Sequence, residues 1–144
     1  MTPDTAPLEE RHCLRLLAGA AVGRVVYTVG ALPAVLPTRY RLDDDGSVLL
    51  RATIGSEFLR AVAGALVAFQ ADEVDEADGS GWSVTVLGTA EATEGNSVAD
   101  SAAPPPTGQV TIRIRPEWVT GRRLLSVAPP CAPGTGTTAA TLPT

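Results

Sequence analysis

Six short runs of apolar and β-branched residues follow one another along the chain, and clusters of Gly, Pro and Asp separate them. Runs of this kind, bounded by turn-forming residues, predict β-strands. The predicted strands span residues 23–29, 34–42, 47–53, 66–74, 81–93 and 109–125. Hairpin signals such as DDDGS join them, and only two short helical segments interrupt them. We therefore predict a mainly β, six-stranded antiparallel barrel and not a βαβ sheet.

The two helical segments lie at the start of the chain and after the third strand. Residues 5–20 predict a helix, with Thr5 as its N-cap and Pro7 in its first turn. A shorter helix is predicted from Glu57 to Gly64, with Ser56 as its cap. Within the strands, Pro37 predicts an edge position or a bulge, because proline cannot donate to a central ladder.

Two segments have no apolar periodicity. Residues 95–108 are rich in Pro, Ala and Ser, and residues 127–144 are a low-complexity tail. Neither can bury enough apolar surface to offset the entropy of ordering. We expect a single domain over residues 1–126, with a flexible Pro-rich linker inside it, and a disordered tail.

The charge of the chain excludes several classes of partner. The net charge of −5 and a pI near 4.7 disfavour binding of bulk nucleic acid, which requires a positive field. No apolar run is long enough to predict a membrane span, and the polar start contains no signal-peptide core. We expect a cytoplasmic protein with neither nucleic acid nor membrane as a partner.

Few side chains could carry covalent or metal chemistry. All 11 basic residues are arginine, so Schiff-base chemistry and a P-loop lysine are excluded. His12 is the single histidine, and Cys13 and Cys131 are too far apart in sequence to indicate a metal cluster or a disulfide framework. The acidic turns lack EF-hand spacing, so we expect no metal. Difficult chemistry would have to come from a cofactor.

The stretch RATIGSEFLRAV, Arg51–Val62, combines the end of a strand, a Gly-Ser turn and a helix start. The N-terminus of a helix offers unpaired N–H groups to an anion. Gly55 would let the backbone approach a ligand closely, Thr53 and Ser56 supply hydroxyls, and Arg51 offers a fork for two phosphate oxygens. The stretch therefore fits a phosphate cradle.

The same stretch also fits an ordinary helix start. Ser56 would cap the helix, Glu57 would complement its dipole, and Arg51 would be a solvated strand residue. Under the cradle interpretation, Arg39 on the neighbouring strand would add a second guanidinium. Spacing alone leaves both interpretations open.

Four segments together resemble the flavin-binding split-barrel family, the pyridoxamine 5′-phosphate oxidase-like proteins, in the small form common in actinobacteria. They are LEERHCLRLLAGAAVGRVVYT, ALPAVLPTRYRLDDDGSVLLRATIGSE, VAFQADEVDEADGSGWSVTVLGTAE and IRIRPEWVTGRR. The resemblance implies a six-stranded split barrel that forms a homodimer, with FMN in grooves at the dimer interface. It also implies a flavin-dependent oxidoreductase acting on a small molecule, without naming its substrate.

The resemblance also assigns residues to the cofactor. The family's phosphate motif of Arg, any residue and Thr, followed by Gly-Ser-Lys, is matched except at the lysine. The segment Pro37–Tyr40 would line the isoalloxazine, and Trp82 and Trp118 would lie near the interface. The implied cofactor-binding residues are Thr38, Arg39, Tyr40, Arg51, Ala52, Thr53, Gly55, Ser56, Trp82 and Trp118. The catalytic residue is unknown; Tyr40 is the nearest candidate.

One departure from the family pattern affects the phosphate directly, because Glu57 replaces the family's lysine. A carboxylate about 4 Å from a phosphate costs roughly 1 kcal/mol in water-like surroundings and more when buried. Glu57 could avoid this cost by turning to solvent or by pairing with Arg60. The chain also lacks the basic C-terminal part of true pyridoxamine 5′-phosphate oxidases, so we do not expect pyridoxal phosphate synthesis.

Two alternatives remain open at this point. Relatives of this fold use the deazaflavin F420, whose acidic tail would favour the arginines Arg39, Arg41, Arg51 and Arg60. The second alternative is a degenerate split-barrel dimer that binds no flavin. Outside the site, strand alternation places Arg113 and Arg115 on the polar face of the last strand, and we expect the acidic turns to be solvated.

Overall fold

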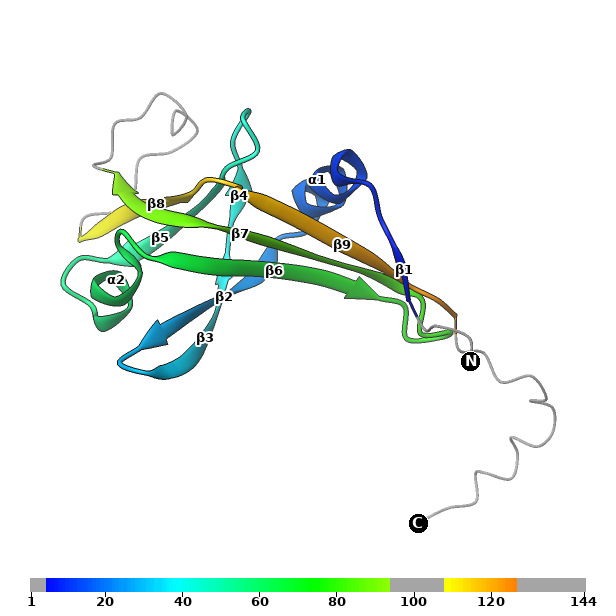
Figure 1. Ribbon diagram of the computed structural model, residues 1–144, viewed down its shortest axis with the longest axis horizontal. Coiled ribbons are helices and arrows are strands. Elements are labelled where there is room, and N and C mark those ends of the chain that lie inside the picture. Colours follow the sequence, from blue (N-terminus) through cyan, green and yellow to red (C-terminus); the bar gives the residue numbers. More distant parts are fainter. Residues whose placement is uncertain (1–4, 94–107, 127–144) are drawn as a thin grey trace, which may run out of the picture.

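The computed structural model describes residues 5–93 and 108–126 (Figure 1). The predicted linker and tail fall almost entirely outside these residues. Nine strands and two helices lie within the described ranges. They are β1 (Thr5–Pro7), α1 (Glu10–Gly19), β2 (Val22–Val29), β3 (Leu32–Arg39), β4 (Arg41–Leu42), β5 (Val48–Thr53), α2 (Glu57–Val62), β6 (Leu66–Val74), β7 (Gly81–Thr93), β8 (Gln109–Ile114) and β9 (Trp118–Leu124).

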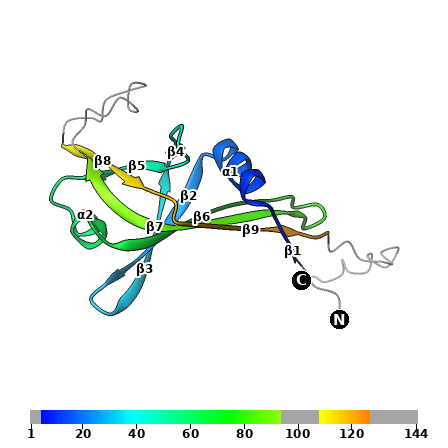
Figure 2. The ribbon, with the colours of Figure 1, turned by 45° about the horizontal axis from the view of Figure 1, so that its top comes forward.

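The strands form one antiparallel sheet that curls back on itself. Its order is β3-β2-β6-β7-β8-β5-β4, and β9 pairs with both β7 and β1. The two ends of this order, β3 and β4, follow each other in the chain, so the sheet is bent into a barrel that is open along one side (Figure 2). The predicted class, a mainly β antiparallel split barrel, is confirmed.

The position of Pro37 follows from this order. Its strand, β3, is the outermost member at one end and pairs only with β2 among the described strands. Pro37 lies opposite Arg24 on an edge strand, where a missing N–H costs no central ladder bond. The predicted edge position is confirmed.

The predicted first helix begins too early. Residues 5–7 form β1, which pairs with β9 through Thr5–Leu124, Ala6–Arg123 and Pro7–Arg122. The N–H of Leu8 continues this contact by donating to the carbonyl of Gly121 at 3.0 Å. The helix starts only at Glu10, with Glu9 as an N-cap that makes no side-chain hydrogen bond. Long-range pairing with β9 therefore overrides the local cap signal.

Two predicted strands are each divided by a change of partner or a bulge. The strand predicted at 34–42 pairs with β2 up to Arg39 and with β5 from Arg41, so Tyr40 marks the bend. In the strand predicted at 109–125, Ile114 lies opposite Ala90 and Trp118 opposite Leu87. Three residues of one strand thus face two of the other, which is a β-bulge, and Pro116 lies within it.

Helix α1 covers the concave side of the sheet over β7 and β9 (Figure 1). Cys13 and Leu17 of this helix are fully buried, and a Cβ on Gly121 of β9 would lie 2.3 Å from the Sγ of Cys13. The core beneath contains Phe69, Val25, Val84, Val86, Ile112 and Ile114. In the described residues, neither helix has the length and apolar character needed to cross a bilayer.

Arg113 departs from the expectation of a solvated polar face. It is buried, and its guanidinium Nη1 lies 2.7 Å from Asp43 and 3.6 Å from Asp45. The hairpin turn between β4 and β5 supplies these carboxylates and covers β8. Alternation along β8 gave the correct face for Arg113, but the covering turn could not be derived from that pattern.

Candidate functional site

A pocket of about 390 Å³ lies where β3, β4, β5 and β8 meet. It is lined by Thr38, Arg39, Tyr40, Arg41, Leu49, Leu50, Arg51 and Gln109. Four of these residues belong to the predicted cofactor set: Thr38, Arg39, Tyr40 and Arg51. The bend at Tyr40 brings them together, because it directs the chain from the β2 side of the barrel to β5.

The lining of this pocket is strongly cationic. It contains three arginines and no carboxylate, although the whole chain carries a net charge of −5. On β5, Leu50 and Ala52 are buried, whereas Arg51 and Thr53 are exposed. Ala52 can therefore contribute only backbone groups to a ligand on the exposed face. Such a lining favours an anionic ligand.

The predicted Gly-Ser turn lies directly after β5. Gly55 has a φ of +80°, and a Cβ placed on it would meet nothing within 4 Å, so the turn is open on that side. The hydroxyl of Ser56 accepts a hydrogen bond from the N–H of Leu59 at 3.1 Å, and the Ser56 N–H donates to Thr53. The predicted strand, turn and capped helix are confirmed as local structure, with α2 ending at Val62.

The charged residues of α2 differ from the expected pairing. Glu57 is exposed. Arg60 donates from Nη1 to the carbonyl of Gly55 at 2.6 Å, and no ion pair with Glu57 is found among the described residues. A guanidinium therefore lies beside the turn at which the family has its lysine.

Tyr40 faces the core with its ring. Its hydroxyl donates to the backbone carbonyl of Leu17, and its ring packs edge-to-face on Phe69 with centroids 4.6 Å apart. Burial, and secondarily the charge of Glu73, raise the pKa of Tyr40 to about 12. With its proton committed to a carbonyl and its pKa raised, the hydroxyl is poorly placed for general acid–base chemistry.

The two tryptophans lie outside this pocket and on opposite faces of the sheet. Trp82 lies opposite Arg123 in the ladder and Trp118 lies opposite Leu87, so alternation along β7 sends the two pairs to opposite faces. Trp82 is half-buried beside α1, whereas Trp118 is 65% exposed on the convex face. Within one chain, the structure does not bring either of them to Arg51.

Some lining residues were missed by sequence reasoning. Gln109 begins β8 and lies opposite Thr53, but it follows a segment with no periodicity, so no pattern pointed to it. Leu49 and Leu50 appear in the sequence only as apolar strand residues. The sequence points to Arg41 only as part of an F420 site, and its position two residues after Arg39 is the available signal.

These elements define a split-barrel protein with a cationic pocket next to an open Gly-Ser turn. The sequence pattern of the pyridoxamine 5′-phosphate oxidase family matches residues 9–123, so the chain belongs to this family. An uncharacterised protein of Mycobacterium tuberculosis is 35% identical over 134 residues, which cover 85% of this chain and 88% of the relative.

Two solved structures extend the comparison. The FAD binding protein of Mycobacterium smegmatis is similar with a TM-score of 0.70 and 28% identity, over 84% of this chain and 99% of that one. A FAD-binding protein of Mesorhizobium loti has a TM-score of 0.70 and 22% identity, over 85% and 98% of the two chains. At this lower identity, the second comparison supports the fold alone.

Proposed function

We propose that this protein binds a flavin, as FMN, and acts as a flavin-dependent oxidoreductase on a small molecule. The observation that carries the proposal is the pocket lined by Arg39, Arg41 and Arg51 with no carboxylate, next to the open turn at Gly55. Membership of the pyridoxamine 5′-phosphate oxidase family and the similarity to a FAD binding protein support it.

The residues present fit the phosphate of such a cofactor. Guanidinium groups bind phosphate oxygens through charge-assisted hydrogen bonds, and three of them line a single pocket here. Thr53 is exposed on the same face of β5 as Arg51, and the turn at Gly55 has room for an approaching ligand. The segment Thr38–Tyr40 forms the adjoining wall.

The division of chemical work follows from this lining. A bound flavin supplies hydride and single-electron transfer. The arginines would bind and orient the anionic end, and the segment Thr38–Tyr40 would position the remainder against a substrate. We assign no general acid or base, since the hydroxyl of Tyr40 is engaged with Leu17.

FMN is preferred over FAD and F420 in this proposal because its single phosphate needs one cationic pocket of limited size. The similarity to FAD binding proteins makes FAD the first comparison. F420 is the second cofactor to compare, because its acidic tail would need arginines beyond those of the pocket. Of the four arginines considered for it, Arg60 is already hydrogen-bonded to Gly55.

We also propose that the protein is a homodimer that associates through the convex face of the sheet. Five apolar residues form one continuous row across five strands of this face. In ladder order they are Val35, Val26, Ala68, Leu87 and Trp118. Val35 and Trp118 are 58% and 65% exposed. A row of this kind is typical of an interaction surface, and a second copy would bury it.

The row and the cationic pocket are adjacent on β3. Val35 and Arg39 lie four residues apart on this strand, and their register partners Val26 and Val22 show that both face the same side. A second copy packed over the row would therefore approach the pocket. This arrangement supports a cofactor groove completed by the partner, as the family resemblance implies.

The test is the cofactor content and affinity of the purified protein. We expect a flavin absorbance band that persists after addition of FMN and desalting. Arg51→Gln should weaken FMN binding at least tenfold. Arg11→Gln, an exposed substitution on α1, serves as the matched control and should leave it unchanged. If FMN, FAD and F420 all fail to bind, the degenerate dimer without flavin replaces this proposal.

A further inference from the structure

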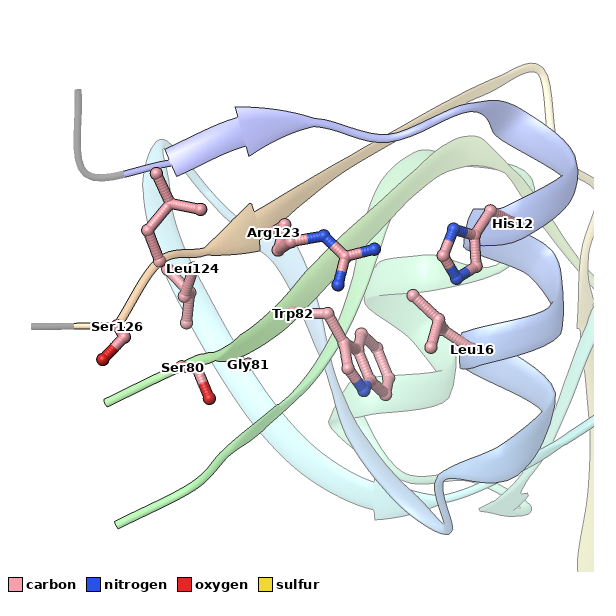
Figure 3. Close-up of a pocket in the computed structure, with 9 residues that line it drawn as sticks. His12, Leu16, Ser80, Gly81, Trp82, Arg123, Leu124 and Ser126 are labelled. Atoms are coloured by element: carbon pink, nitrogen blue, oxygen red, sulfur yellow. The ribbon is translucent and has the colours of Figure 1, made fainter. Parts of the chain in front are cut away.

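We propose that a second site, between α1 and the ends of β7 and β9, binds a small planar monocarboxylate. This site is separate from the cationic pocket and independent of the proposed flavin function. It is a pocket of about 280 Å³ whose lining includes His12, Leu16, Ser80, Trp82, Arg123 and Leu125 (Figure 3). Its size, close to the lower limit for ligand pockets, admits a small molecule and excludes a nucleotide.

The position of Arg123 is the first argument. In the ladder, Arg123 lies opposite Trp82, and Trp82 lies opposite Glu73, so these three side chains share the concave face that α1 covers. Among the described residues, the guanidinium of Arg123 makes no hydrogen bond or ion pair, and Glu73 is two strands away. Arg113 and Arg115, in contrast, each have a carboxylate partner.

The surroundings of Arg123 are the second argument. Figure 3 shows its guanidinium pointing toward the imidazole of His12, with the indole ring of Trp82 beneath and Leu16 beside it. The pocket thus combines a cationic fork, a second N–H donor and an aromatic surface. An arginine fork matches the two oxygens of a carboxylate, and the flat indole favours a planar group attached to it.

The wall also contains two serines, Ser80 and Ser126. The hydroxyl of Ser80 donates to the carboxylate of Asp78 at 2.7 Å, so its proton is already committed. The remaining contacts around the ligand would come from the apolar residues Leu16 and Leu125. A single negative charge on a flat, mostly apolar molecule therefore suits the pocket better than a phosphate dianion does.

The two tryptophans allow a direct test, because the sequence contains only two. In a Trp118→Phe background, Trp82 becomes the single indole and reports on this pocket. Benzoate is the probe, benzyl alcohol is its uncharged counterpart, and inorganic phosphate is the non-planar anion. We expect benzoate to change the Trp82 emission saturably, with a dissociation constant of about 1 mM or below. The other two compounds should not saturate in this range.

Neighbouring arginines provide the matched variants. Arg123→Gln should weaken benzoate binding at least tenfold, and His12→Gln should weaken it several-fold. Arg122→Gln removes the same charge from the opposite face of β9 and should leave binding unchanged within about twofold. All variants should retain the far-ultraviolet circular dichroism of the parent. Failure of benzoate to saturate, or equal losses in the Arg122 and Arg123 variants, would overturn the proposal.

Discussion

The hydroxyl of Tyr40 ties the bend between β3 and β4 to helix α1, through its hydrogen bond to Leu17. In the folded protein its pKa is raised from 10.0 to about 12, first by burial and then by Glu73. A raised pKa adds stability that is complete below the unfolded pKa and is lost as pH rises through the folded one. A two-unit shift corresponds to at most about 2.7 kcal/mol, and partial solvent access lowers this to about 1–2 kcal/mol.

The Tyr40→Phe variant isolates this contribution. Near neutral pH, it should lose about 1 kcal/mol of unfolding free energy with the hydrogen bond. Between about pH 10 and 12, the parent should lose stability more steeply than the variant, so that the two curves converge. Urea denaturation across this range measures the difference. A parallel decline in the parent and Tyr40→Phe would contradict the assignment.

Glu57 stands where the family pattern described in the sequence analysis has a lysine. Its exposed carboxylate lies one residue after Ser56, while Arg60 lies against the carbonyl of Gly55. We predict that Glu57→Lys tightens FMN binding by about ten- to a hundredfold at low salt. The substitution replaces a repulsion between the carboxylate and the phosphate by an attraction between the ammonium and the phosphate, and each is about 1 kcal/mol at 4 Å. The Arg60→Gln variant should bind FMN more weakly than the parent.

Titration of flavin fluorescence at two ionic strengths measures both effects. The gain from Glu57→Lys should shrink as salt rises, since exposed charges are screened over about 10 Å at 0.1 M. Glu76→Lys, a charge reversal in the distant turn before β7, is the control and should not alter FMN affinity. If Glu57→Lys binds FMN no better than the parent at low salt, the phosphate does not lie at this turn.

Local patterns predicted the long hairpin of β6 and β7, whose two strands pair with each other without interruption. β6 and β7 have the predicted bounds, and α2 has its predicted cap at Ser56. The errors fall where a strand changes partner: at Tyr40, at the bulge containing Pro116, and at β1. These positions depend on residues distant in sequence, which no local propensity encodes.

Gly88 marks the point at which the partner of β7 changes from β9 to β8. A Cβ at this position would lie 1.8 Å from the carbonyl oxygen of Arg115, which belongs to the bulge. Backbone cannot move aside as a side-chain end can, so we predict that Gly88→Ala costs about 3 kcal/mol of unfolding free energy. Gly19→Ala, where a Cβ meets nothing within 4 Å, should be neutral or slightly stabilising. Thermal and urea unfolding of both variants test this; equal stabilities would show that the bulge can shift freely.

The two candidate sites differ in how far sequence could predict them. The cationic pocket was partly predictable, because a motif with fixed spacing indicated Arg51. Arg39 was expected beside it through hairpin pairing, but Arg39 pairs with Val22 of β2 and lines the pocket because the chain bends at Tyr40. The carboxylate pocket was not, because Trp82 and Arg123 meet only through the pairing of β7 with β9. Sequence also treated Trp82 and Trp118 alike, since the face on which each lies depends on strand register and on the bulge before β9.

The proposed dimer makes the convex face testable independently of any cofactor. We expect the parent to have twice the 14.8 kDa mass of one chain in light scattering after size exclusion. Trp118→Glu places a charge at the most exposed end of the apolar row, and burying it without a partner would cost several kcal/mol. This variant should therefore elute as a monomer.

The control is Leu32→Glu, which introduces the same charge at another exposed apolar residue. Leu32 is 72% exposed at the hairpin end of β3 and lies off the row. This variant should remain dimeric. If the partner completes the cofactor groove, Trp118→Glu should also bind FMN more weakly, with the loss growing as the protein is diluted. A parent that is monomeric, or a Trp118→Glu variant that stays dimeric, would move the interface away from this face.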